Sequence, residues 1–155
     1  EKASDNLVSF RLNEGKSLFK ELTKQVEMIK DLLLKSHPFE KERLPKIKEK
    51  LKTASNELLL NDKIDSDRLE QELIYYSEKI DITEEKVRLK EHCNHFIKTA
   101  KESKANGKKL GFITQEMGRE INTLGSKAHH LDIQKIVVLM KDNLEKIKEQ
   151  VLNVL

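Results

Sequence analysis

Four polar residues in the middle of the sequence have types and spacing that could support phosphate chemistry. Asp81, Glu85, Arg88 and His92 follow one another at intervals of four, three and four residues, so in a helix they lie along one face. Carboxylates one turn apart can hold a hydrated divalent cation, an arginine can grip a phosphate, and a histidine can exchange protons near neutral pH. The same spacing also fits ordinary ion pairs on a solvated helix. Spacing alone therefore leaves both interpretations open.

A second polar set surrounds an apolar stripe in residues 107–127. Cleavage of an RNA backbone needs charge neutralisation, an activated nucleophile and a protonated leaving oxygen. Acidic, basic and amide groups on two neighbouring helices could supply all three. The alternative is a buried polar network that fixes helix register. One flank of the stripe carries Glu116, Glu120, Thr123 and Lys127, and another carries Gln115, Arg119, Asn122 and Ser126.

Lysines gather around Gly107, where only Glu102 opposes them. Such a cluster attracts a polyanion such as RNA without sequence preference, although lysines also serve solubility. The candidate RNA-binding residues therefore include two lysines of this group, Lys108 and Lys109. The whole group is Lys98, Lys101, Lys104, Lys108 and Lys109.

These sets combine into one hypothesis, in which two helices converge around a divalent cation, Mn²⁺ or Mg²⁺. Carboxylates that cluster without a cation would repel one another and the phosphate alike. In this hypothesis Asp81 and Glu85 bind the metal, which polarises the scissile phosphate. The catalytic residues are His92, which moves the proton, together with Glu116 and Glu120. The side chains that steady the RNA backbone are Arg88, Arg119 and Lys127, with Lys108 and Lys109.

The elements that must position these residues are helices. A first helix is expected from near Asp5 to Lys35, ended by the triplet at 36–38, and a second follows with Pro45 near its start. A polar turn is expected at 61–66, and a third helix after it. The apolar stripes of these helices are Leu18, Leu22, Val26, Ile29 and Leu33; Leu44, Ile47, Leu51, Ala54 and Leu58; and Leu69, Leu73, Tyr76 and Ile80.

The second half of the chain continues this pattern. Residues 81–84 could open a new helix, with Asp81 as cap and Glu84 reaching back, or could lie within one long helix. A loop is expected at 104–107 and a turn at 128–131. The last helix carries a heptad seam. The stripes are Ile82, Leu89, Cys93 and Phe96; Leu110, Ile113, Met117, Ile121 and Leu124; and Ile133, Val137, Met140, Leu144, Ile147 and Val151.

The predicted fold class is all-α, a single helical domain over 1–155 built as an elongated bundle of long antiparallel helices. We expect about five or six helices, with the first and last among the longest. Charged residues make up 37% and aromatics 5% of the chain, which is typical of long solvated helices. Narrow apolar seams on long helices favour a homo-oligomer or packing against a further domain.

Composition also limits the class of protein. The net charge of +3 is too small by itself to indicate a nucleic-acid partner. One cysteine, Cys93, excludes an internal disulfide framework and fits a reducing cytoplasm; its place on an apolar stripe predicts a packed thiol. No apolar run approaches 18 residues, so no membrane contact is expected. The chain begins with Glu1 rather than Met, which we interpret as a fragment.

Several motifs resemble the C-terminal domain of the YicC/YloC family of bacterial endoribonucleases. The longest match is the Gln-Glu-Met-x-Arg-Glu-x-Asn-Thr-x-x-Ser-Lys pattern of residues 115–127. Further matches, in order and with sensible spacing, span nearly the whole chain: 11–15 with Leu12 as a departure, 68–72, 79–85, 88–92 and 145–151. The family's N-terminal α/β domain would precede Glu1.

The resemblance implies a metal-dependent endoribonuclease that cuts single-stranded RNA and assembles as a hexamer. Two departures put any ligand role at their positions in doubt, because Gly111 stands where many relatives carry Asp and Gly118 where many carry Asn. The alternative function is a helical oligomerisation or RNA-binding module without chemistry of its own, which supports the N-terminal domain.

Overall fold

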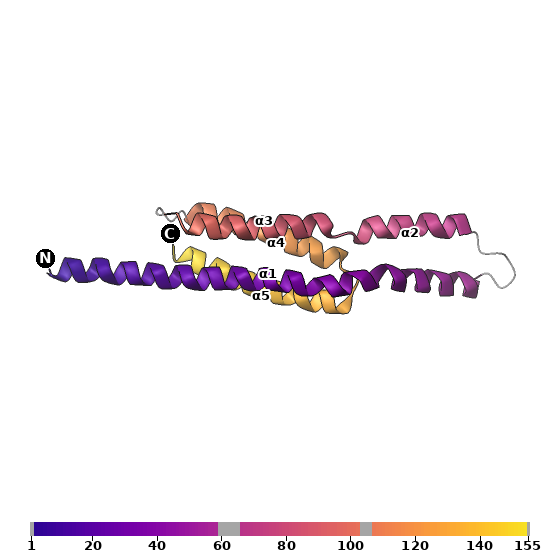
Figure 1. Cartoon of the computed structure of the whole chain (residues 1–155), viewed down its shortest axis with the longest axis horizontal. Coiled ribbons are helices and arrows are strands. Elements are labelled where there is room, and N and C mark those ends of the chain that lie inside the picture. Colours follow the sequence, from indigo (N-terminus) through magenta and orange to yellow (C-terminus); the bar gives the residue numbers. More distant parts are fainter. Residues whose placement is uncertain (1, 59–65, 103–106, 155) are drawn as a thin grey trace.

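The computed structural model describes residues 2–58, 66–102 and 107–154. Within these ranges it contains helices and no strand, so the all-α prediction is confirmed. The helices form an elongated bundle in which α1 runs along the whole length (Figure 1). Helix α1 packs on α5, α3 and α2, while α4 packs on α3 and α5. The five helices of the described ranges are α1 (Lys2–Leu58), α2 (Ser66–Ile80), α3 (Thr83–Ala100), α4 (Gly107–Lys127) and α5 (Leu131–Leu152).

The two helices predicted for residues 5–58 are one continuous helix, α1, of 57 residues. The predicted end at Ser36-His37-Pro38 is therefore wrong. Pro38 and Pro45 each remove one N–H from the helix ladder. Both prolines are exposed, and so are Leu34 and Lys41, whose carbonyls lose their partners. Water can bind these carbonyls on the solvent side, so the helix continues while its other face stays packed.

The core lies where α1, α3, α4 and α5 overlap. Every predicted apolar stripe residue of α4 and α5 is buried, as are Leu22, Val26, Ile29 and Leu33 of α1. Cys93 is fully buried, and burial raises the pKa of its thiol to about 12, with the charge of Lys30 opposing the shift. This thiol is inert at neutral pH. The side chains with no exposed surface are Val26, Ile29, Leu89, Cys93, Phe96, Met117, Ile121, Ala128 and Ile147.

Residues 44–58 of α1 and α2 form a two-helix arm beyond the core (Figure 1). Here the apolar stripe of α1 is not buried, because Leu44 and Ala54 are exposed and Ile47 and Leu51 are only half-buried. Two helices side by side can cover one face of each other but cannot enclose a core. The predicted turn at 61–66 lies almost entirely outside the described residues.

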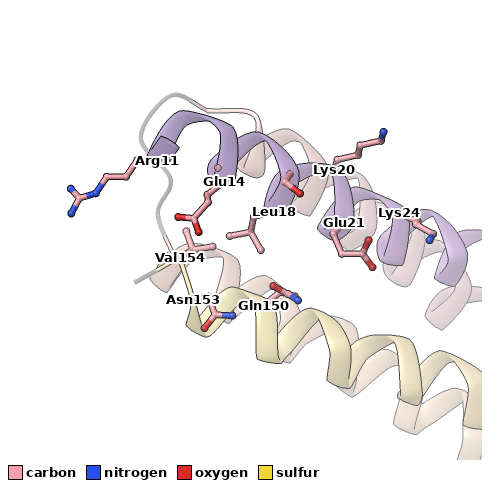
Figure 2. A pocket seen from close by; sticks show the side chains of 11 residues that line it. Arg11, Glu14, Leu18, Lys20, Glu21, Lys24, Gln150, Asn153 and Val154 are labelled. Atoms are coloured by element: carbon pink, nitrogen blue, oxygen red, sulfur yellow. The ribbon is translucent and has the colours of Figure 1, made fainter. Parts of the chain in front are cut away.

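At its other end α1 extends past the last turn of α5. Residues 4–17 are exposed throughout, although their apolar positions Val8 and Leu12 continue the heptad seam that is buried from Leu22 to Leu33. An open hollow lies where this part of α1 meets the C-terminal end of α5 (Figure 2). Its lining includes Glu14, Leu18, Glu21, Gln150 and Val154.

Short connections join the helices that carry the candidate site. A new helix opens after Asp81, as one of the two alternatives predicted, but its N-cap is Ile82 and Glu84 does not reach back. The turn between α4 and α5 contains His129 at φ 45°, followed by His130, whose Nδ1 accepts a hydrogen bond from the Asp132 amide and caps α5. The loop predicted at 104–107 falls largely outside the described residues.

Two glycines of α4 allow it to lie close to α5. A Cβ at Gly125 would stand 3.1 Å from Val137 Cγ1, and one at Gly118 would stand 3.3 Å from Leu144 Cδ2. A Cβ at Gly111 would meet nothing within 4 Å. Close packing against α5 therefore accounts for Gly118 and Gly125 within a helix, where glycine otherwise costs stability.

This difference predicts unequal responses to alanine. Gly111→Ala should raise the free energy of unfolding by about 0.5–1 kcal/mol, because alanine loses less conformational entropy in a helix. Gly125→Ala should gain less or lose stability, because Val137 must move. Urea unfolding of both variants measures the difference. Equal stabilisation by both would show that the contact at Gly125 does not constrain the packing.

Candidate functional site

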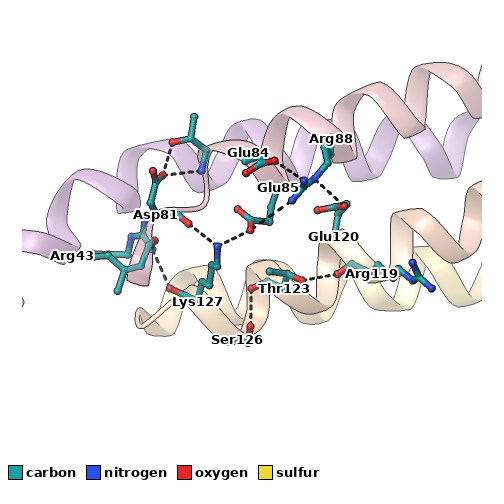
Figure 3. Close-up of polar contacts among 12 residues, drawn as sticks. Arg43, Asp81, Glu84, Glu85, Arg88, Arg119, Glu120, Thr123, Ser126 and Lys127 are labelled. Atoms are coloured by element: carbon teal, nitrogen blue, oxygen red, sulfur yellow. Dashed lines mark hydrogen bonds and ion pairs between the residues drawn. The ribbon is translucent and has the colours of Figure 1, made fainter. Parts of the chain in front are cut away.

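The two polar segments singled out in the sequence, 81–92 and 115–127, lie side by side. Helices α3 and α4 run antiparallel, so the start of α3 faces the end of α4. Two ion pairs cross between them: Lys127 Nζ to Glu85 Oε1 at 2.7 Å, and Arg88 Nε to Glu120 Oε1 at 3.1 Å (Figure 3). We call these four residues the charge network.

Arg88 is the half-exposed cation of the charge network and holds more than one carboxylate. Its Nη1 donates to Glu84 Oε1 at 2.6 Å, one turn back on the same helix. Its Nη2 lies 4.0 Å from Glu85 Oε1, and its Nε meets Glu120 on α4. Glu84 is largely exposed, with 75% of its side chain in solvent, so its bond to Arg88 contributes little stability. Arg88 can exchange that partner for another anion at small cost.

Glu85 is the buried carboxylate of the charge network, with 4% of the residue exposed. Burial alone would raise its pKa. The hydrogen bond from Lys127, the backbone, and the charges of Lys127 and Arg88 outweigh burial and bring the pKa below its ordinary value. Its Oε2 is buried and has no hydrogen-bond partner among the described residues. Glu85 is thus ionised at neutral pH and held chiefly through one oxygen.

Lys127 and Asp81 join the ends of the two helices. Lys127 is the last residue of α4, and its Nζ also donates to the Asp81 backbone carbonyl at 3.3 Å. The Asp81 carboxylate accepts from the Thr83 hydroxyl at 2.6 Å and from the Thr83 amide at 3.0 Å. These bonds lower the pKa of Asp81 below its ordinary value. Its carboxylate therefore serves the start of α3.

The predicted convergence around one cation is not found in this arrangement. Across residues 2–58, 66–102 and 107–154, no group of three or more His, Cys, Asp or Glu side chains is placed to hold a metal ion. The physical reason is that the carboxylates of Glu85 and Glu120 are neutralised by Lys127 and Arg88. The described residues as they stand do not fit a resident divalent cation, and a role for a metal stays a prediction.

The remaining predicted residues lie outside the charge network. His92 is half-buried on α3 and makes no hydrogen bond or ion pair with the described residues. Glu116 pairs with Arg119 at 3.4 Å on its own helix, and 78% of the Arg119 side chain is exposed. Lys108 and Lys109 are exposed at the start of α4, about 28 Å along the helix from Lys127. Their assigned roles stay predictions.

One residue beside the charge network, Arg43 of α1, has a structural role that the sequence analysis did not predict. It is 6% exposed, and its Nη1 donates to the backbone carbonyls of Ile80, Lys127 and Ala128. A signal for it exists: positions 36, 40 and 43 continue the heptad seam of Val26, Ile29 and Leu33 with polar residues. The predicted helix end at 36–38 concealed this continuation.

The burial of Glu85 predicts a change in acid stability. Because its folded pKa lies below its unfolded value of about 4.3, its contribution is complete above that value and is lost as pH falls through the folded pKa. Glu85→Gln should lower the free energy of unfolding by about 1–3 kcal/mol at pH 7, since Lys127 loses a charged partner.

This deficit should shrink as pH falls below the unfolded value of about 4.3 and through the lower folded pKa, where the wild-type carboxylate itself becomes protonated. Urea unfolding at several pH values measures it. The control is Glu145→Gln, which removes an exposed carboxylate that pairs with Lys148 on the same helix. A deficit for Glu85→Gln that stays constant over this range would contradict the account.

Comparison with known proteins agrees with the resemblance found in the motifs. The family model described as "Endoribonuclease YicC-like, C-terminal" matches residues 37–155. A probable endoribonuclease YicC of Clostridioides difficile (strain 630) is 36% identical over 155 residues, which cover 99% of this chain and 53% of the relative. A probable endoribonuclease YicC of Haemophilus influenzae is 40% identical over 90 residues, which cover 58% of this chain and 31% of the relative.

The chain thus spans about half the length of the Clostridioides difficile relative. None of the described helices is both long and apolar enough to cross a membrane. The family match covers most of the chain and the charge network within it. The chain belongs to the YicC-like endoribonuclease family, of which it matches the C-terminal part.

Proposed function

We propose that this chain is the C-terminal part of a cytoplasmic, metal-dependent endoribonuclease that cleaves single-stranded RNA. Family membership supports the reaction class. The observation that carries the proposal is the charge network, in which the exchangeable cation Arg88 adjoins two carboxylates held in fixed positions between α3 and α4. Such an arrangement combines a phosphate-binding group with groups that can accept a proton.

In this proposal Arg88 releases Glu84 and binds a phosphate of the RNA backbone. The exchange is inexpensive because Glu84 is largely exposed. Glu120, one turn from Glu116 on α4, is then close enough to the bound phosphate to accept a proton from the attacking hydroxyl. His92 lies one turn beyond Arg88 on α3 and delivers the proton that the leaving oxygen needs. Lys127 keeps Glu85 neutralised and adds positive charge beside the strand.

The first test uses the full-length protein with His92→Ala and Glu120→Ala. Each should lower the rate of single-stranded RNA cleavage at least about 100-fold, the range expected for loss of a proton-transfer group. Helicity by circular dichroism and assembly by light scattering should not change. Wild-type cleavage by both variants would mean that these residues only fix helix packing.

Arg119→Ala is the matched comparison on the same helix, because its side chain is exposed and, among the described residues, forms an ion pair only with Glu116. It should weaken RNA binding while leaving the rate at saturating RNA unchanged. The slope of log binding constant against log salt should fall by about 0.7, the value for one phosphate contact on a single strand.

A second candidate function is an assembly or RNA-binding module that lacks activity of its own. The exposed apolar side chains at the N-terminal end of α1 favour it, because apolar residues arranged on a helix of this kind usually meet a partner. They are Leu7, Val8, Phe10 and Leu12, each at least 55% exposed. A homo-oligomer, by resemblance a hexamer, belongs to both candidates as a proposal.

Comparing this chain with the full-length protein separates the two candidates and tests the metal. We expect cleavage by the full-length protein to stop when EDTA removes divalent cations, and to return with Mn²⁺ or Mg²⁺. Cleavage by residues 1–155 alone under those conditions would contradict a purely structural module. Undiminished cleavage by the full-length protein in EDTA would contradict the metal dependence.

A further inference from the structure

Arg43 places a buried positive charge where two helices end. Ile80 is the last residue of α2 and Lys127 the last of α4, and Arg43 Nη1 donates to their carbonyls at 2.7 and 3.3 Å and to that of Ala128 at 3.2 Å. The last carbonyls of a helix lack partners within it and carry its partial negative charge. Two helix ends thus converge on one guanidinium (Figure 3).

No carboxylate among the described residues lies within ion-pair distance of Arg43. Burial lowers the pKa of its guanidinium, and the charges of Glu40 and Asp81 oppose this shift. An arginine remains charged in either case. The carbonyls therefore provide the close compensation for this charge, and removing Arg43 would leave them without a donor.

The contacts of Arg43 connect directly to the charge network. Lys127 is bound at both ends: its carbonyl accepts from Arg43, while its Nζ reaches Glu85 Oε1 and the Asp81 carbonyl. Asp81 follows Ile80, whose carbonyl is also held by Arg43. These hydrogen bonds therefore connect α1, the connection between α2 and α3, and the end of α4 in a closed cycle.

We infer that Arg43 is a positioning residue, which holds the ends of α2 and α4 together so that the Lys127 side chain stays on Glu85. It touches no reacting atom and acts through Lys127. Its effect on cleavage rests on the proposed function, whereas its effect on Glu85 does not. The two can therefore be tested separately.

The first measurement is an NMR titration of the Glu85 carboxyl in the full-length protein. In Arg43→Met the titration midpoint should move upward, towards that of Lys127→Met, because burial then acts on Glu85 without a fixed ammonium. Lys127 of α4 and Arg88 of α3 are the charged groups that face this carboxyl. Lys30→Met, which removes a charge from α1 that pairs with Glu27, should leave the midpoint unchanged. An unchanged midpoint in Arg43→Met overturns the inference.

The second measurement is a double-mutant cycle on RNA cleavage. Arg43→Met should lower kcat about tenfold when Lys127 is present, and less than about twofold in a Lys127→Met background, because the two residues act as a unit. Equal losses in both backgrounds would mean that Arg43 is a structural cap only. Absence of cleavage by the wild type would refute the proposed function, and the titration would still decide the role of Arg43.

A conservative variant covers the case in which Arg43→Met does not fold. Arg43→Lys keeps the charge, but lysine is one bond shorter, so its ammonium does not reach the position of Nη1, which donates to all three carbonyls. The Glu85 midpoint should again move upward, by less than in Lys127→Met. A wild-type midpoint in a folded Arg43→Lys variant would show that the guanidinium does not position Lys127.

Discussion

The carboxylate of Glu85 lies between α3 and α4 with almost no access to solvent, and a charge in such a place must be compensated nearby. Lys127 supplies that compensation, and it can do so only because α4 ends opposite the start of α3. The same requirement determines what surrounds the pair, since Lys127 is the terminal residue of its helix and its carbonyl needs a donor of its own. Arg43 of α1 donates to that carbonyl. The buried charge of Glu85 is thus connected through Lys127 to residues of three helices, α3, α4 and α1.

Local pattern predicted most of the fold. The stripes of α3, α4 and α5 lie in the core because a period of three and four identifies the packed face whatever the partner helix is. The predicted end of the first helix was wrong because the rule that a proline ends a helix, applied to Ser36-His37-Pro38, considers only local backbone effects. Tertiary packing on one side and hydration of the freed carbonyls on the other outweigh that rule. This error also concealed Arg43, whose position is meaningful only if the seam continues through residue 38.

The sequence predicted which residues belong to the candidate site better than it predicted how they are arranged. Spacing along one helix places Glu85 and Arg88 on a common face, but it does not state which side chains of another helix they will meet. In the structure the carboxylates of Glu85 and Glu120 each meet a cation instead of a second carboxylate, as electrostatics favours when both kinds of residue are available. The close contacts that Gly118 and Gly125 allow with α5 likewise depend on a second helix and could not be predicted from spacing along α4.

The exposed first part of α1 has a consequence for helix–coil equilibria. A helix of about a dozen residues in water is barely stable by itself, because its first turn must be ordered before any hydrogen bond is gained. In α1 that nucleation has already occurred in the packed segment that begins near Leu22, and each preceding residue adds only one step of propagation. The stretch from 4 to 17 therefore loses helical order progressively as temperature rises, beginning with the residues farthest from the packed segment. A partner that covers its apolar side would convert this gradual fraying into a cooperative transition.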